Sequence, residues 1–166
     1  LTIENGATLT LASDSLKIYG DLTNNGTFTQ TGGLLVFAAD SSQSLLSNFT
    51  MNNTLINNRL LVPDGDTLSI AAGSTVKFKT GSDFDYTGGV DCGYLQVDGK
   101  LIADGTAQDS ITFTRDGDSG NWGVIGLNDA DGTSSISYSN IEYGNYIYNF
   151  VGSDPVFGAL SFYQTD

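Results

Sequence analysis

The sequence contains no histidine, and Cys92 is its only cysteine. Without histidine, the chain cannot build a Ser-His-Asp or Cys-His catalytic system, nor a zinc site made of His and Cys. A single cysteine also excludes a disulfide within the chain. Proline occurs only 2 times, so Gly, Asn and Asp must form most of the turns. These absences exclude the commonest nucleophilic enzymes and folds stabilised by internal disulfides.

Basic residues are also scarce, with 6 Lys and Arg against 19 Asp and Glu, and the net charge is −13. The negative field should repel nucleic acid and anionic membrane surfaces, so we expect neither as a partner. No run of about 18 apolar residues occurs, so we expect no membrane insertion. Every basic residue lies at or before Arg115. The acidic stretch that follows would suit divalent cations, a basic partner, or simply a well-hydrated surface.

Short strands separated by turns dominate the pattern, most clearly between Leu68 and Tyr143. Apolar residues alternate over a few positions before Gly or Asp interrupts them, and no segment has the i, i+3, i+4 apolar spacing of a helix. Strands this short cannot bury an apolar face alone, so they need a shared core. Hydrophobic residues make up 39% of the chain, which is enough for one folded domain. The sequence therefore predicts an all-β protein.

Two internal matches indicate how these strands share a core. Residues 1–11 (LTIENGATLTL) align with residues 68–78 (LSIAAGSTVKF) at an offset of 67. Residues 16–22 match residues 95–101 at an offset of 79. The difference of 12 residues indicates an insertion between Phe78 and Leu95. Repetition interrupted by one loop is typical of a solenoid whose coils stack on one another.

These units, with residues 121–125 (NWGVI) and 136–144 (ISYSNIEYG), resemble a right-handed parallel β-helix of the pectin-lyase-like type. The resemblance covers roughly residues 1–144. It implies a solenoid of about seven to eight coils of about 20 residues each, with one inserted loop at 79–94. It further implies a single domain over residues 1–166, as a module of a larger secreted or cell-surface protein.

Proteins with similar repeats include adhesins, structural fibre proteins and polysaccharide-degrading enzymes, so the fold alone does not decide the function. The Asn-x-Asp, Asp-Asp, Gly-His-Gly and Arg-x-Lys set of polygalacturonase-like enzymes is absent here. The lyases that share this fold use Ca²⁺ with a Lys or Arg base, for which Arg115 beside Asp116 and Asp118 is the remaining candidate. We therefore expect a non-catalytic structural or adhesive module located outside the cell or on its surface. The alternative is a carbohydrate-binding or carbohydrate-cleaving module.

The inserted loop is the first candidate ligand site, because functional residues concentrate on loops that project from a rigid scaffold. Its carboxylates and aromatic rings suit either sugar stacking or a cation, although surface loops also accept extra length without any function. The candidate residues are Asp83, Asp85, Tyr86, Asp91 and Tyr94.

Two acidic turns are candidate Ca²⁺ sites, although nothing in the sequence requires a cofactor. One turn holds Asp116, Asp118 and Asn121, and the other holds Asp129 and Asp131. Carboxylates two residues apart can point at one cation, and Gly permits the bend between them. Neither turn has the bidentate Glu that ends an EF-hand loop, and both could equally be ordinary Asp-Gly turns.

The two ends of a stacked coil expose strand edges, which natural solenoids cap. The aromatic-rich segment 145–166 would either cap the stack or offer it to a neighbour. The leading hypothesis is therefore that the chain associates with other copies, or with other surface proteins, through its coil ends and exposed faces.

Three further features bear on the coil itself. Trp122 is expected to anchor the core as its largest side chain. Asn residues recur at the predicted turns and are expected to stack into amide ladders. Thr8 and Thr10, like Thr27 and Thr29, form Thr-x-Thr pairs, but the sequence shows no sustained array of the kind that an ice-binding face requires.

Overall fold

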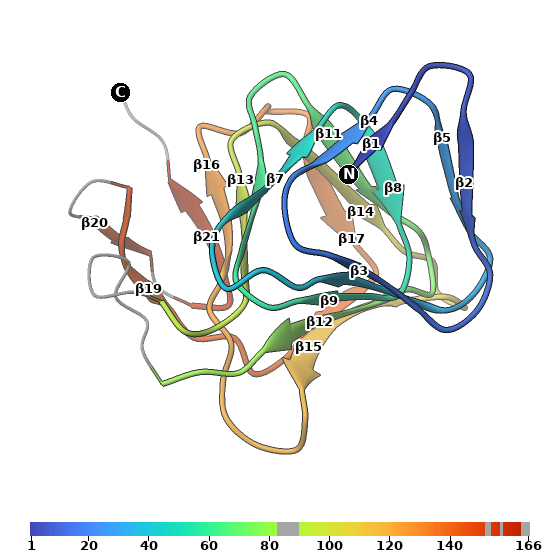
Figure 1. The fold of residues 1–166 in the computed structure, drawn as a ribbon. Coiled ribbons are helices and arrows are strands. Elements are labelled where there is room, and N and C mark those ends of the chain that lie inside the picture. Colours follow the sequence, from blue (N-terminus) through green and yellow to red (C-terminus); the bar gives the residue numbers. More distant parts are fainter. Residues whose placement is uncertain (83–89, 152–153, 157, 164–166) are drawn as a thin grey trace.

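The computed structural model describes residues 1–82, 90–151, 154–156 and 158–163. Within these ranges the chain contains no helix, so no helix capable of crossing a membrane occurs there. Its strands form three faces around a shared core (Figure 1), and the strands of successive coils pair in parallel. The chain is thus a right-handed parallel β-helix, which confirms the predicted fold class.

Each coil contributes one strand to each face. The first face contains β1 (Thr2–Ile3), β4 (Leu22–Asn24), β7 (Gln43–Leu46), β10 (Arg59–Val62), β13 (Tyr94–Val97), β16 (Ile125–Asn128) and β21 (Leu160–Tyr163). The second face contains β2 (Thr8–Leu11), β5 (Thr27–Gln30), β8 (Phe49–Met51), β11 (Thr67–Ile70), β14 (Lys100–Asp104) and β17 (Ser135–Ser137). The third face contains β3 (Ser15–Ile18), β6 (Leu34–Phe37), β9 (Thr54–Ile56), β12 (Thr75–Lys79), β15 (Ile111–Asp116) and β18 (Ser139–Ile141). One antiparallel pair, β19 (Ile147–Val151) with β20 (Asp154–Val156), lies outside this scheme.

The described strands make six complete coils, and β21 begins a seventh. This is slightly fewer than the predicted seven to eight coils, because the later coils are longer than about 20 residues. On the first face, Thr2 pairs with Thr23 in the next coil, whereas Val62 pairs with Val97. The added length lies in loops outside the core, so the strands keep their register.

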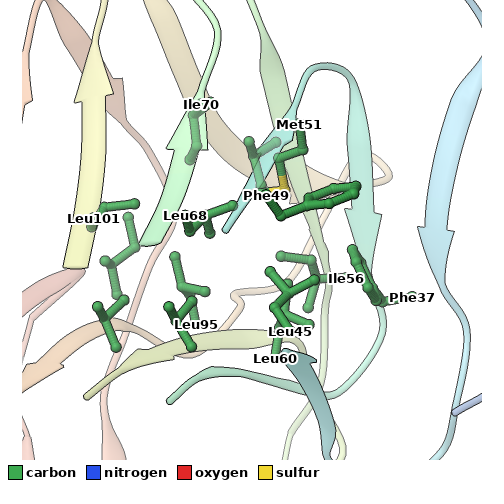
Figure 2. Close-up of a cluster of buried hydrophobic side chains, with 14 of the residues drawn as sticks. Phe37, Leu45, Phe49, Met51, Ile56, Leu60, Leu68, Ile70, Leu95 and Leu101 are labelled. Carbon is green, nitrogen blue, oxygen red and sulfur yellow. The ribbon is translucent and has the colours of Figure 1, made fainter. Parts of the chain in front are cut away.

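Inward side chains form columns that run through successive coils. On the first face the column Leu22, Leu45, Val62, Val97 and Leu127 is buried throughout. Figure 2 shows buried side chains from all three faces meeting in the centre. Burying one such side chain stabilises the fold by about 1.5–3 kcal/mol. Stacking therefore gives each short strand the apolar contacts that it cannot make alone.

Trp122 is fully buried, as predicted, and it enters the core from a loop. The third-face column passes through Phe37, Ile56 and Phe78. Arg115 follows Phe78 in register, but the indole of Trp122 stacks on the Phe78 ring instead, with 4.2 Å between ring centroids. Trp122 thus occupies the place that the strand itself would fill with a cationic side chain.

The repeat that the sequence reveals is a corner, not a whole coil. In the turn around Gly6 the Ala7 N–H donates to Glu4 O at 2.9 Å, and around Gly73 the Ser74 N–H donates to Ala71 O at 3.2 Å. Both glycines have a positive φ, of 78° and 77°, as the third residue of a type II turn requires. The first turn joins β1 to β2, whereas the second joins β11 to β12. The alignment of residues 1–11 with 68–78 is therefore shifted by one face.

Long loops gather on one edge of the solenoid, where the third face leads into the first. In the last three complete coils this edge carries residues 80–93, 117–124 and 142–159, whereas in the first three it carries short turns. Figure 1 shows β19 and β20 outside the coil beside this edge. A second apolar cluster, formed by Cys92, Tyr94, Val124 and Ile147, packs these loops against the solenoid. The predicted insertion is thus the first of three on one edge.

Corner asparagines bind the backbone of the neighbouring coil. Asn48 Oδ1 accepts from Thr67 N–H at 3.0 Å, and Asn53 Oδ1 accepts from Thr75 N–H at 3.0 Å. These bonds satisfy backbone donors at strand ends. They connect side chain to backbone between coils, which differs from the predicted ladders of stacked side-chain amides.

Candidate functional site

The inserted loop is anchored at its base by one of its own candidate residues. Asp91 accepts through Oδ1 from the Ser82 N–H at 2.8 Å and through Oδ2 from the Ser82 hydroxyl at 3.3 Å. Tyr94 is fully buried in the second apolar cluster, where its ring packs against protein. Asp83, Asp85 and Tyr86 lie outside the described residues. The two described candidates thus hold the loop in place, and ligand binding by the other three stays a prediction.

The turn with Asp116, Asp118 and Asn121 lies on the same edge as the inserted loop. Asp116 forms an ion pair with Lys77 at 3.5 Å, in which both side chains are somewhat less than half exposed. Such a pair contributes about 0–1 kcal/mol. The Asn121 carbonyl accepts from the Gly81 N–H at 3.1 Å, which joins the two loops through their backbones.

The turn with Asp129 and Asp131 lies on a different edge, between the first and second faces. Asp131 Oδ1 accepts from the Thr133 N–H at 2.7 Å and from the Thr133 hydroxyl at 2.6 Å. The two acidic turns therefore do not combine into one site. Across the described ranges, no three His, Cys, Asp or Glu side chains gather as a metal site would need. Ca²⁺ binding at either turn stays a prediction.

The two hydrogen bonds from Thr133 should change the pKa of Asp131, which can be tested. They lower the pKa of Asp131 below its ordinary value of 3.8, the side-chain bond more than the backbone bond, and Lys100 adds a smaller effect in the same direction. Because the folded pKa is depressed, this carboxylate stabilises the fold above pH 3.8 and loses that effect as the pH falls through the folded value. We expect Thr133→Ala to raise the pKa of Asp131, as measured by carboxyl-carbon NMR titration. An unchanged pKa would contradict the assignment, and Thr114→Ala is the control.

β21, the last described strand of the first face, carries an exposed apolar side chain. In β21, Leu160 pairs with Ile125 and Phe162 with Leu127, so both continue inward columns. The Phe162 side chain is nevertheless 74% exposed. Beside it lies a hollow of about 180 Å³, lined mainly by Leu127, Ile136, Leu160 and Phe162. In the described part of the chain, β17, β18 and β21 are the last strands of their faces, each paired on one side only.

Phe162 was not among the candidate residues derived from the sequence, where it counted only as one aromatic in the 145–166 segment. The signal is present in the alternation of Leu160 and Phe162, which marks a strand with an inward face. What the pattern cannot supply is the position of that strand as the last in its sheet.

Comparison with protein-family models, with curated proteins and with solved structures finds no match to this chain.

Proposed function

We propose that the chain is a non-catalytic structural or adhesive module of an extracellular or cell-surface protein, and that copies of it associate through the open C-terminal end of the solenoid. One observation carries this proposal. Phe162 is 74% exposed, although the residues that precede it in its column, from Leu22 to Leu127, are buried. Within the described residues, the last layer of strands thus presents an apolar side chain that a further layer would cover.

A second copy would supply what this end lacks. The edges of β17, β18 and β21 can each accept a further strand, which adds backbone hydrogen bonds and covers the hollow beside Phe162. The acidic surface opposes such contacts through like charge, since the net charge is −13. Added salt should therefore strengthen the association, because screening weakens repulsion between exposed charges.

The contacts of Arg115, the remaining candidate for a catalytic base, support a non-catalytic role for the chain. Its Nη1 donates to Gly120 O at 3.1 Å, and its guanidinium carbon lies 3.8 Å from the centre of the Tyr143 ring. Both contacts use the guanidinium as a hydrogen-bond donor and a cation, and it has no acceptor to offer a substrate proton. The pectin-lyase-like assignment is part of the same proposal, and it is supported by the corner repeats and the parallel β-helix.

Sedimentation velocity over a range of protein concentrations tests the proposal. We expect the unmodified chain to associate, and Phe162→Asp to weaken this association by at least about tenfold, because a carboxylate would be buried in the contact. Phe162 is exposed, so the substitution should leave the fold intact, as circular dichroism would verify. The control is Leu46→Asp, which adds the same charge to the middle of the first face. Association that survives Phe162→Asp, or a monomer at every concentration and salt level, would disprove the proposal.

A further inference from the structure

The second face is divided into two sheets, whereas the first and third faces are continuous. β2 pairs with β5, and β8, β11, β14 and β17 form a separate sheet. We call the space between β5 and β8 the seam. In Figure 1, β2 and β5 lie apart from β8, on the outer side of the solenoid. The facing edges of β5 and β8 therefore lack the ladder that joins neighbouring coils elsewhere on this face.

Side chains hold the seam together in place of a ladder. The rings of Phe28 and Phe49 stack with 4.9 Å between centroids. At one end of the seam, Gln30 Nε2 donates to Asn53 O at 2.8 Å, and Asn52 Nδ2 donates to Gln30 O at 2.7 Å. These contacts hold β5 and β8 at a fixed separation, so the seam is a preformed groove in the second face.

Two hollows open along the seam, one at each end. Their volumes are about 360 and 260 Å³. The first lies around Asn24 and Asn48, and the second around Gln30 and Asn52. None of the residues that line either hollow is charged, although the chain has a net charge of −13. Hydroxyl, amide and backbone groups supply most of the lining.

A column of hydroxyl groups crosses the seam on the outer surface. Thr10 pairs with Thr29 across β2 and β5, and Thr50 pairs with Ser69 across β8 and β11. The stacked rings of Phe28 and Phe49, each one residue earlier, align these two pairs. The column that begins with one residue of each Thr-x-Thr pair thus extends over four coils as single hydroxyl groups, although the seam interrupts their spacing.

Asn24 adds an unused acceptor at this site. It lines the larger hollow, and its Oδ1 is buried without a hydrogen-bond partner. Its Nδ2 donates to Asn48 O at 3.2 Å. Exchanging the two amide atoms would bring one oxygen against another, so the orientation is fixed. A buried acceptor without a partner is destabilising, and a ligand hydroxyl that displaces the wall of the hollow would pair with it.

We propose that the seam binds an uncharged oligosaccharide. The sugar hydroxyls can both donate to and accept from the amides and hydroxyls that line the hollows. An acidic ligand would find no cation in the lining and would meet the negative field of the chain. An apolar ligand would leave polar lining groups without partners. An extended peptide strand would have to break the Gln30 contacts and separate Phe28 from Phe49.

NMR titration of the nitrogen-15-labelled chain with neutral hexasaccharides of glucose, xylose, mannose and N-acetylglucosamine tests this site. We expect at least one of them to shift the backbone amides of Thr29 and Thr50 and the side-chain amide of Asn24. Thr50→Lys should lower the affinity by at least about tenfold, because it places a charged chain beside the groove. Thr29→Lys is the second variant, and Thr2→Lys on the first face is the matched control, expected to bind like the unmodified chain.

Four outcomes would overturn this proposal. No shift with any of the neutral sugars at millimolar concentration would exclude the site. Binding that survives both seam variants would place the sugar elsewhere, and equal binding of oligogalacturonate would remove the argument from charge. Shifts produced only by a peptide with the sequence of β5 would show that the seam accepts a strand instead. Each result is independent of the association test, because Phe162 lies at the other end of the solenoid.

Discussion

Trp122→Ala is expected to destabilise the chain by about 3–5 kcal/mol, the range for removing a buried aromatic side chain. Trp122 is fully buried and stacks on Phe78, and its Nε1 donates to Glu142 O at 2.6 Å. Alanine would leave a cavity in the column and remove the only described donor to that carbonyl. Urea unfolding followed by circular dichroism would measure the loss as a lower midpoint at an unchanged slope.

Two further variants separate packing from the loss of any aromatic ring. Trp122→Phe retains a ring above Phe78 but removes the bond to Glu142, so we expect a smaller loss of about 1–3 kcal/mol. Tyr19→Ala removes a ring that is 70% exposed and should change the stability by less than about 0.5 kcal/mol. If Trp122→Ala lowered the free energy of unfolding no more than Tyr19→Ala does, the described packing of Trp122 on Phe78 would be contradicted.

Gly93→Ala is the second substitution for which we expect a large effect. A Cβ at Gly93 would collide with the carbonyl oxygen of Ile56 and would lie 3.0 Å from the backbone nitrogen of Lys79. Both obstacles are backbone atoms, so no side chain can rotate to make room. Overpacking of this kind costs about 1–3 kcal/mol and sometimes more. Thermal unfolding should show a clear decrease in the midpoint.

The hydrogen bonds of Gly93 explain why the substitution should also destabilise the neighbouring coils. Its N–H donates to Lys79 O at 2.8 Å, and its carbonyl accepts from the Gly123 N–H at 3.0 Å, so it joins the loops of consecutive coils. Gly20→Ala is the control, because a Cβ there meets nothing within 4 Å and φ is not positive. We expect that variant to remain within about 0.5 kcal/mol of the unmodified chain. Equal stability of the two variants would show that the loops are not packed as described.

The sequence was sufficient to predict the solenoid because short alternating strands recur along the chain between turns rich in Gly, Asn and Asp. It was not sufficient to assign strands to faces. The turns at Gly6 and Gly73 use the same type II geometry at different corners, so their sequences match although their faces differ. Corner length varies from coil to coil, and only the pairing of strands shows which residues share a column.

The same limit applies to the candidate sites. Tyr94 has the residue type of a sugar-stacking ring, but its burial depends on Val124 and Ile147, which come from loops of later coils. The seam exists because β5 does not pair with β8, and no local sequence pattern in either strand predicts this lack of pairing. Local chemistry could therefore be read from the sequence, whereas the exposure of each group could not.

Hydrogen–deuterium exchange at low and high protein concentration tests the proposed association most directly, because it locates the contact. If copies associate through the open end, the amides of β17, β18 and β21 will exchange more slowly at high concentration. The amides of β8 and β11, in the middle of the solenoid, will not change. Identical exchange of β17, β18 and β21 at both concentrations, or slowing confined to other strands, would contradict association through this end.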